Sequence, residues 1–333
     1  MGVTRKLKRI CNHCVTPIYT EVDICPKCAS YLGATPQYMP PALFPETILH
    51  GHYYIGGILG SGGFGITYMA LDLRTMCKVA IKEYYVKAFI KRRNLFQHDW
   101  TIVPNDDEGG KRFQNGVKLF LEEGRKIELF NYMPNIVSVR SYFRENQTAY
   151  LVMEFIEGIT LQEYLKQNGM VLTVGKTMEF MKPVIHSLIT MHEKQIVHRD
   201  ISPDNIMIDR QGRSVLIDFG AASKYDNRQD IGYSVIKKGY APPEQYSEYG
   251  NQGPWTDVYG VCATIYRMIT GKLPQDSQLR MKQNELVLPS TLGVSISPKQ
   301  EMALMRGLEL SIAERYSTLQ QLYLDLYEER RGV

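Results

Sequence analysis

The sequence has no apolar stretch long enough to cross a lipid bilayer, no internal repeat and no low-complexity tract. A membrane-spanning helix needs about 20 consecutive apolar residues. Near the N-terminus, Cys11, Asn12 and His13 follow a short basic start, at the place where a signal peptide would need an apolar run. We therefore expect a cytoplasmic protein with no membrane segment in this chain.

The chain also lacks a strong charge bias, since its 333 residues include 39 Lys and Arg and 35 Asp and Glu, for a net charge of +4. So small an excess makes nucleic acid an improbable main partner. Hydrophobic residues make up 44% and charged residues 22%, which is ordinary globular usage and argues against widespread disorder. These properties do not indicate an oligomeric state.

Cysteines are scarce after position 28, where only the isolated Cys77 and Cys262 remain. The other four form the pattern C-x2-C-x10-C-x2-C and are Cys11, Cys14, Cys25 and Cys28. Two such pairs can place four thiolates around Zn²⁺, and a segment of about 30 residues cannot build its own core without such a metal. We predict a structural zinc site, with iron–sulfur or redox use as alternatives. Its role could be protein docking, autoregulation, structural capping or nucleic-acid binding.

Three parts are expected along the chain. Residues 1–33 form a zinc-ribbon-like module, residues 34–51 a proline-rich linker and residues 52–330 a large domain. In the large domain, strand-like runs precede a segment that is mainly helical from Thr160 onward. Strands first and helices afterwards predict an α+β fold with two lobes of different architecture.

Residues 84–112 show no clear periodicity and contain a basic run, Lys91–Arg93, and an acidic run, Asp106–Glu108. A connection of this length is either functional or mobile. Because charge runs usually mark solvated surface, we interpret the segment as a solvated insertion without a specific partner.

The glycine-rich segment that starts at Gly60 fits the pattern G-x-G-x-x-G, with Gly62 and Gly65 at the other motif positions. Alone this pattern is weak, because it also occurs in dinucleotide-binding folds and in ordinary hairpins. A dinucleotide-binding fold needs a helix directly after the glycines, whereas Ile66–Ala70 continues as a strand. The glycines are therefore predicted to cap a hairpin whose backbone lies close over phosphates.

Lys82 ends an apolar strand-like run soon after the glycines. A lysine in this place can bridge the α- and β-phosphates of ATP if a carboxylate holds its ammonium group. Glu122 and Glu123 on the next predicted helix, Phe113–Phe130, are the candidates, and the sequence after the helix favours Glu123. Alone, Lys82 could equally be an exposed strand lysine.

The segment His198–Asn205 matches the pattern H-R-D-x-x-x-x-N and is the most specific in the chain. Asp200 is expected to accept or orient the proton of a substrate hydroxyl, and Asn205 to bind Mg²⁺. Asp218, the first residue of an Asp-Phe-Gly triplet, supplies a second ligand for Mg²⁺ at a strand-to-loop junction. Four such motifs in this order indicate phosphoryl transfer from ATP.

Through these motifs, residues 52–330 resemble bacterial members of the eukaryotic-type (Hanks-type) serine/threonine protein kinases. The resemblance implies a β-rich N-lobe over residues 52–155 and a helical C-lobe over residues 156–330. It also implies transfer of the γ-phosphoryl group of ATP, with Mg²⁺, to Ser or Thr hydroxyls of protein substrates in bacterial signalling, the kinase itself included.

The resemblance assigns roles to residues outside the main motifs. Met153 takes the place of the gatekeeper of the nucleotide pocket, and the backbone of Glu154 and Ile156 takes the place of the hinge that meets adenine. Three further positions have structural roles in the family, as a brace of the catalytic loop and as an ion pair near the end of the activation segment; they are Asp257, Glu244 and Arg315.

The sequence departs from the family pattern at two positions that face the catalytic aspartate in the family. Ser202 stands where serine/threonine kinases usually have lysine, and Lys237 stands where they usually have threonine. We hypothesise that Lys237 supplies the charge that is missing at Ser202, because a cation stabilises the transition state of phosphoryl transfer. The alternative is that Lys237 is an exposed loop lysine.

Arg199 before the catalytic aspartate suggests control by phosphorylation of the activation segment, since arginine can pair with phosphate. The available acceptors are Ser223, Tyr225, Tyr233 and Ser234.

Two other functions remain as alternatives. The departures at Ser202 and Lys237 would suit a pseudokinase that binds nucleotide or partners without efficient transfer. A second alternative makes the cysteine-rich segment the main functional part, as a docking or nucleic-acid module. The absence of the usual lysine also leaves the preference for Ser and Thr over Tyr partly open.

Overall fold

The computed structural model describes residues 7–33, 39–63, 65–94, 99–220, 222–224, 236–247 and 250–327. The chain divides into two compact units, of which the first comprises Met1–Asn131 and Ser138–Phe155 and the second comprises Tyr132–Val137 and Ile156–Val333. Within the described part of the chain, no helix combines the length and the apolar character that a membrane crossing requires.

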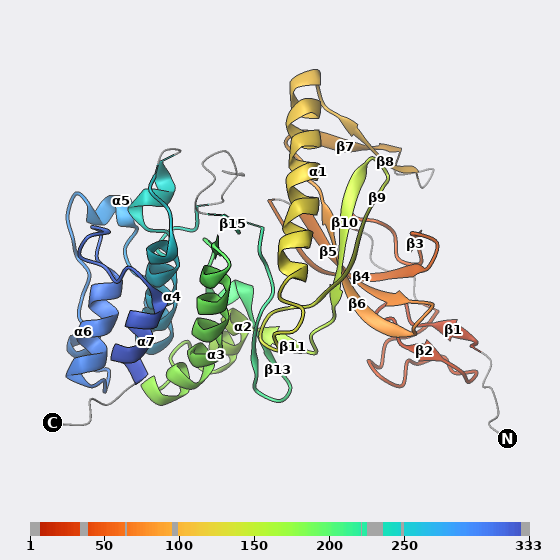
Figure 1. The fold of residues 1–333 in the computed structure, drawn as a ribbon. Coiled ribbons are helices and arrows are strands. Elements are labelled where there is room, and N and C mark those ends of the chain that lie inside the picture. Colours follow the sequence, from red (N-terminus) through yellow and green to blue (C-terminus); the bar gives the residue numbers. More distant parts are fainter. Residues whose placement is uncertain are drawn as a thin grey trace. The chain divides into compact units, whose positions relative to one another are not determined.

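The first unit is built on an antiparallel sheet of six strands in the order β3-β4-β5-β6-β10-β9 (Figure 1). The strands are β3 (Ile48–Leu49), β4 (Tyr53–Gly62), β5 (Gly65–Asp72), β6 (Cys77–Tyr84), β10 (Thr148–Glu154) and β9 (Val139–Glu145). Along most of β6, every second residue is buried, as expected for a strand whose neighbouring side chains point to opposite faces of a sheet. The sheet therefore places successive residues of β6 in two different environments.

One long helix, α1 (Asp107–Glu128), packs against β9 and β10 (Figure 1). It begins well before Phe113, where the apolar spacing predicted its start. The cause is a cap: the Asp106 side chain accepts a hydrogen bond from the Gly109 amide at 2.6 Å. Acidic residues in the first turn also interact favourably with the helix dipole. The acidic run in this region is thus a helix start.

The interpretation of residues 84–112 as a solvated insertion without a partner is wrong. The segment forms a hairpin of β7 (Ile90–Asn94) and β8 (Asp99–Pro104) that leads into α1. In β7, Arg92 is buried, whereas its neighbours Lys91 and Arg93 are exposed. A basic run on a strand presents two faces, and here only one of them meets water.

The buried partner of Arg92 is Glu83 on β6. Arg92 Nη2 donates to Glu83 Oε2 at 2.6 Å, and both side chains are 0% exposed. Arg92 Nε and Nη1 donate to the carbonyl oxygens of Pro41 and Trp100, each at 2.9 Å. Two tyrosine hydroxyls also donate to the Glu83 carboxylate, those of Tyr68 and Tyr150. A buried ion pair is tolerated when its remaining polar atoms are satisfied, so this network ties the β7–β8 hairpin to the six-stranded sheet.

The cysteine-rich segment forms a small sheet of β1 (Arg9–Ile10) and β2 (Pro17–Ile18), with two similar turns. The amide of Val15 donates to the Cys11 carbonyl at 2.8 Å, and the amide of Ala29 donates to the Cys25 carbonyl at 2.9 Å. Val15 and Ala29 have positive φ angles of 49° and 57°. A β-branched residue rarely adopts such a conformation, so Val15 must be held by its surroundings.

Val15 is held against Gly56 of β4. A Cβ atom added to Gly56 would lie 2.3 Å from Val15 Cγ1, closer than any real contact. The pairing of β4 with β5 shifts its register between Ile55 and Ile58, which bends the strand at this point. The cysteine-rich segment therefore docks onto the sheet at a place that only glycine can provide.

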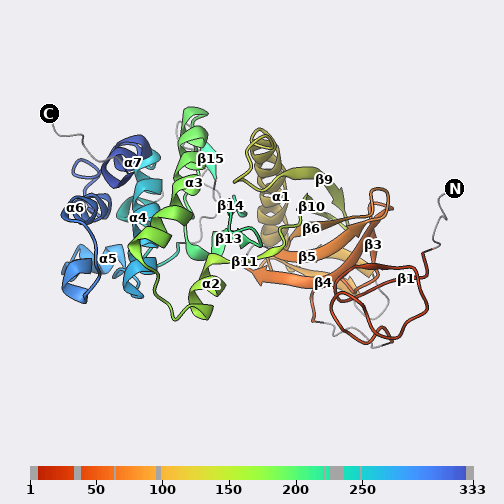
Figure 2. The ribbon, with the colours of Figure 1, turned by 90° about the horizontal axis from the view of Figure 1, so that it is seen from below.

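The second unit is mainly helical, with α3, α4, α6 and α7 side by side (Figures 1 and 2). Its helices are α2 (Leu161–Gln167), α3 (Val174–Glu193), α4 (Pro254–Thr270), α5 (Ser277–Arg280), α6 (Pro298–Gly307) and α7 (Leu319–Tyr327). Helix α4 is buried along most of its length and contacts α3, α6 and α7. It therefore forms the core of this unit and provides a rigid base for the loops around it.

Short strands carry the H-R-D-x-x-x-x-N segment and the Asp-Phe-Gly triplet. They are β11 (Gly158–Thr160), β12 (Ile196–Val197), β13 (Ile206–Asp209), β14 (Ser214–Leu216) and β15 (Ser223–Lys224). Strands β11, β13 and β14 form one sheet, and β12 pairs with β15. The segment His198–Asn205, which the family resemblance identifies as the catalytic loop, lies between β12 and β13. Asp218 follows β14. The α+β fold expected from the sequence is confirmed.

Candidate active site

The glycines of the G-x-G-x-x-G motif lie where β4 meets β5. Strand β4 ends at Gly62, and β5 begins at Gly65. A Cβ atom on Gly65 would lie 2.2 Å from the Glu83 carbonyl oxygen, so glycine is needed for β5 to run this close to β6. Among the described residues, a Cβ atom on Gly60 or Gly62 would meet no heavy atom within 4 Å. The space on the Cβ side of these two glycines is therefore empty of described protein atoms.

Lys82 and Glu123 meet within the first unit. Lys82 Nζ lies 3.9 Å from Glu123 Oε1, and the side chains are only 13% and 10% exposed. Glu123 lies on the buried face of α1, next to Phe120, whose ring centroid is 5.9 Å from Lys82 Nζ. Glu122, the other candidate from the sequence, is exposed. The structure thus places Glu123 beside the lysine.

Met153 and Glu154 end strand β10. Met153 is buried and pairs with Ala80 of β6. The Glu154 amide donates to the Ser138 carbonyl at 2.9 Å, and the Glu154 carboxylate accepts from the Ser138 amide at 3.0 Å. These bonds fix the end of the strand. Ile156 follows as the first residue of the second unit's long segment and is half-buried.

Asp257 on α4 holds the catalytic loop. Its carboxylate accepts the amide of His198 at 2.8 Å, the amide of Arg199 at 2.7 Å and Nε2 of His192 at 2.7 Å. Asp257 is fully buried. The bracing role implied by the family resemblance is therefore observed as two hydrogen bonds from loop amides to one carboxylate, which also accepts a third from α3.

Asp200, Asn205 and Asp218 come together in the second unit. Asn205 Nδ2 donates to the Asp200 carbonyl at 2.8 Å, and the Ile217 amide donates to the Asn205 carbonyl at 3.1 Å. Asp218 Oδ1 accepts the Gly220 amide at 3.0 Å. These bonds connect the catalytic loop to the residue just before Asp218, so the three side chains share one framework.

Burial controls the charges in this framework. Burial raises the pKa of Asp200 above its ordinary value, although the charge of Lys237 and a hydrogen bond from Asn205 oppose the rise. Burial lowers the pKa of His198, so this imidazole is held neutral. Burial alone would raise the pKa of Asp257, but the hydrogen bonds that it accepts lower the pKa below its usual value. The brace is therefore an anion.

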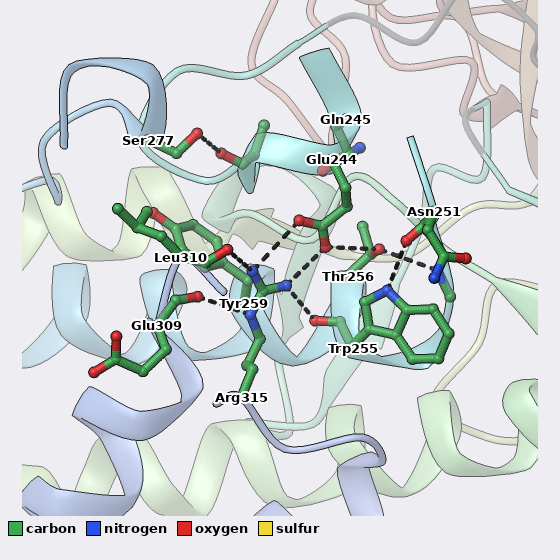
Figure 3. A network of polar contacts seen from close by, with 12 residues as sticks. Glu244, Gln245, Asn251, Trp255, Thr256, Tyr259, Ser277, Glu309, Leu310 and Arg315 are labelled. Carbon is green, nitrogen blue, oxygen red and sulfur yellow. Dashed lines mark hydrogen bonds and ion pairs between the residues drawn. The ribbon is translucent and has the colours of Figure 1, made fainter. Parts of the chain in front are cut away.

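Glu244 and Arg315 form the ion pair implied by the resemblance (Figure 3). Arg315 Nη1 donates to Glu244 Oε1 at 2.7 Å, and the side chains are 0% and 5% exposed. The same guanidinium donates to the carbonyls of Glu309 and Trp255 at 2.9 and 3.0 Å, and the Thr256 hydroxyl donates to Glu244 at 3.1 Å. The pair joins the end of the activation segment to α4.

Sequence reasoning missed two residues of the site. His192 on α3 donates to Asp257, and Gln245 Nε2 donates to the Arg199 carbonyl at 2.8 Å. Both stabilise the catalytic loop from outside its motif. The sequence gives no sign of the buried position of Gln245, and the histidine at the end of α3 resembled an ordinary helix C-terminal residue.

The candidate phosphorylation sites lie outside the part that the structure describes. Tyr225, Tyr233 and Ser234 belong to the undescribed segment, and the side chain of Ser223 is likewise outside it. Control through Arg199 remains a prediction.

The four cysteines of the N-terminal pattern converge. Their sulfur atoms all lie within 4.8 Å of one another. Cys11 Sγ is 3.7 Å from Cys28 Sγ, and Cys14 Sγ is 3.6 Å from Cys25 Sγ. A tetrahedral zinc ion with Zn–S bonds of about 2.3 Å requires sulfur atoms about 3.8 Å apart. The donor set and its spacing therefore fit Zn²⁺.

Comparison with known proteins agrees with this geometry. The family model for the protein kinase domain matches residues 53–304. The chain is 27% identical over 286 residues to serine/threonine-protein kinase PrkC of Bacillus subtilis, covering 84% of this chain and 40% of that protein. It is 28% identical over 330 residues to serine/threonine-protein kinase B of Synechocystis, covering 96% of this chain and 50% of that protein. The chain thus spans half or less of the length of these relatives.

A solved structure agrees as well. PpkA-294 in its apo form superposes with a TM-score of 0.74 and 31% sequence identity, covering 86% of this chain and 99% of that one. The matched region contains the glycine hairpin, the Lys82–Glu123 pair and the braced catalytic loop. The chain therefore belongs to the protein kinase domain family.

Proposed function

We propose that this chain is an active serine/threonine protein kinase, which transfers the γ-phosphoryl group of ATP to Ser and Thr hydroxyls of proteins, itself included. The observation that carries the proposal is the shared framework of Asp200, Asn205 and Asp218 within a loop braced by Asp257. A nucleotide-binding scaffold could use Asn205 and Asp218, but it would have no chemical need for Asp200 as a proton acceptor. The proposal places the reaction in the cytoplasm, where ATP is abundant.

In the second unit, Asp200 would orient the substrate hydroxyl and accept its proton. Asn205 and Asp218 would hold Mg²⁺, which when bound neutralises charge on the phosphate oxygens. The side-chain amide nitrogen of Asn205 donates a hydrogen bond to the Asp200 carbonyl. The Oδ1 atom of Asn205 is therefore the atom that can bind a metal. Carboxylate and amide oxygens suit a hard cation such as Mg²⁺.

In the first unit, Lys82 would hold the α- and β-phosphates while Glu123 keeps its ammonium group in place. The backbone of the glycine hairpin would cover the phosphates at Gly60 and Gly62, while Gly65 allows β5 to pass close to β6. The adenine would meet the side chain of Met153 and the backbone of Glu154 and Ile156. The Glu154 amide already donates a hydrogen bond to the Ser138 carbonyl. The Glu154 carbonyl is therefore the candidate acceptor for the adenine amino group.

The N-terminal segment is proposed to bind a structural zinc ion through Cys11, Cys14, Cys25 and Cys28. Four thiolates leave no open position for a substrate, so the metal would stabilise the segment. The packing of Val15 against Gly56 supports a structural role for this segment within the first unit.

The test is transfer of radiolabelled phosphate from ATP with Mg²⁺ to the protein itself and to a generic basic protein, for the intact chain and for Asp200→Asn. We expect label on serine or threonine that is lost in Asp200→Asn, and phosphoamino-acid analysis identifies the acceptor. Nucleotide binding without any transfer in the intact chain would contradict the proposal and favour a scaffold. Label on tyrosine alone would correct its specificity.

A further inference from the structure

The catalytic loop has no cation at the position where the family usually has one. Ser202 stands two residues after Asp200, and its side chain is fully buried. Charge spreads over the phosphoryl oxygens during transfer, and a nearby cation stabilises that charge. A serine hydroxyl carries no charge, so a side-chain cation at this place beside Asp200 would come from another segment.

A tight turn holds Lys237 beside this loop. The amides of Tyr240 and Ala241 both donate to the Lys237 carbonyl at 3.0 Å. Gly239 has a φ of +83°, which suits the third position of a type II turn. A Cβ atom on Gly239 would lie 2.6 Å from Leu273 Cγ, so the turn packs closely against the chain behind it. The backbone of Lys237 is therefore well fixed.

The ammonium group of Lys237 reaches the vacant position. It donates to Ser202 Oγ at 2.8 Å and also to the Asp204 carboxylate. Asp200 and Lys237 line one small pocket in the second unit, together with Tyr240 and Gln245. The Asp204 side chain is 51% exposed, and ion pairs at such positions contribute little to stability. The ammonium group can therefore exchange this partner for a phosphoryl oxygen.

We propose that Lys237 is a catalytic residue that supplies, from the activation segment, the charge that Ser202 does not. The inference rests on the proposed kinase activity. In the transfer step, the substrate hydroxyl oxygen bonds to the γ-phosphorus while the bond from phosphorus to the bridging oxygen breaks. The electron pair of that bond leaves with ADP, and the hydroxyl proton passes to Asp200. Lys237 contacts the transferred group and neutralises its charge without exchanging any atom.

The experiment measures kcat and KM for ATP for Lys237→Met, Lys237→Arg and the matched control Lys238→Met, once thermal unfolding has shown that each variant folds. Lys238 is the exposed neighbour, and its replacement makes the same change in net charge. We expect Lys237→Met to lower kcat about 100-fold with KM for ATP changed less than about threefold. The kcat of Lys237→Arg should stay within about tenfold of the wild-type value, and the kcat of Lys238→Met should equal the wild-type value.

A second arm returns the cation to the loop. In the Lys237→Met background, Ser202→Lys should recover at least about tenfold in kcat, since it restores a charge beside Asp200. If this double variant does not fold, the Lys237→Arg and Lys237→Met variants still test the role of the Lys237 charge. A kcat of Lys237→Met within about threefold of the wild type would overturn the inference and leave the kinase function standing. A wild-type chain without transfer would overturn the proposed function, and the inference with it.

Discussion

The Arg199 amide donates to Asp257 Oδ1 at 2.7 Å, while Arg199 itself has a φ of +68°. Residues other than glycine rarely adopt this conformation, and it persists only where the surrounding structure holds it. Asp257 belongs to α4, the core helix of the second unit. The geometry of the catalytic loop therefore depends on a helix that follows it by more than fifty residues.

This dependence predicts the effect of Asp257→Asn. The neutral amide offers one acceptor oxygen where the carboxylate offers two, so one loop amide loses its partner. We expect the free energy of unfolding to fall by about 1–3 kcal/mol and kcat to fall at least about tenfold. Asp209→Asn is the control, because Asp209 accepts the Gln211 and Arg213 amides in the β13–β14 turn. It should lower stability and leave kcat unchanged. Equal losses of kcat in both variants would contradict the bracing role.

The buried pair of Arg92 and Glu83 predicts a large effect from Arg92→Met. Removal of one partner leaves the other charge buried and unpaired, which costs about 3–5 kcal/mol. Arg93→Met is the matched control, since that side chain is 59% exposed, and it should cost less than about 0.5 kcal/mol. Urea unfolding measures both. The double variant Arg92→Met/Glu83→Gln should regain part of the loss, and similar stabilities for the two single variants would show that the pair is not structural.

The cysteine cluster predicts that metal removal lowers stability. We expect purified protein to contain about one zinc ion per chain, and Cys14→Ser to lose it. Chelation should lower the Tm by roughly 4 °C or more, as a loss of about 2 kcal/mol does in a domain of this size. Elemental analysis and thermal unfolding provide the two measurements. Cys77→Ser replaces an exposed cysteine outside the cluster and should retain the metal. Iron and sulfide in place of zinc would correct the identity of the metal.

Docking of the cysteine-rich segment predicts a difference between two neighbouring glycines. In Gly56→Ala the new methyl group would clash with Val15, whereas in Gly57→Ala it would lie 3.4 Å from the His13 carbonyl oxygen, near ordinary contact. We expect only Gly56→Ala to release the segment, seen as faster proteolysis before the large sheet while zinc stays bound. Equal protease resistance in both variants would mean that the segment does not depend on this contact.

The neutral state of His198 predicts a pH dependence of stability. Its folded pKa lies below the ordinary value of 6.5, so below about pH 6.5 the unfolded chain binds a proton that the folded chain does not. The contribution of His198 to stability is therefore present above this pH and lost as the pH falls through it. Asp257, whose pKa is also lowered, acts with the same sign in a more acidic window.

Urea unfolding between about pH 5.5 and pH 8 checks this prediction, because the window lies above the titration of ordinary carboxylates. His198→Asn should flatten the profile, and His186→Asn, at an exposed position of α3, should leave it unchanged. An unchanged slope in His198→Asn would assign the pH dependence to other groups.

Local patterns were sufficient to predict the elements that carry the chemistry. The strand around Lys82, the hairpin of glycines and the order of the Asp200, Asn205 and Asp218 motifs follow from spacing and from the residue types that phosphate and Mg²⁺ require. The brace by Asp257 could be assigned only through the family resemblance, because its partners are backbone amides far away in the sequence.

Long-range burial was not predictable from the sequence. A charge run such as Lys91–Arg93 carries no sign of which side chain will find a partner, and the partner of Arg92 lies on a separate strand. The relationship between Lys237 and Ser202, which lie on two loops separated by 35 residues, could be hypothesised from the sequence only through the family resemblance. The capping role of Asp106, in contrast, was a local signal that could have been used.

The arrangement on β6 also has an evolutionary consequence. Lys82 and Glu83 are neighbours on one strand, so their side chains point to opposite faces, and each face has its own partner. A relative that lost the hairpin would keep the Glu83 carboxylate buried without its arginine, which would be destabilising. We therefore predict that gain or loss of the hairpin coincides with a change of the residue that directly follows Lys82.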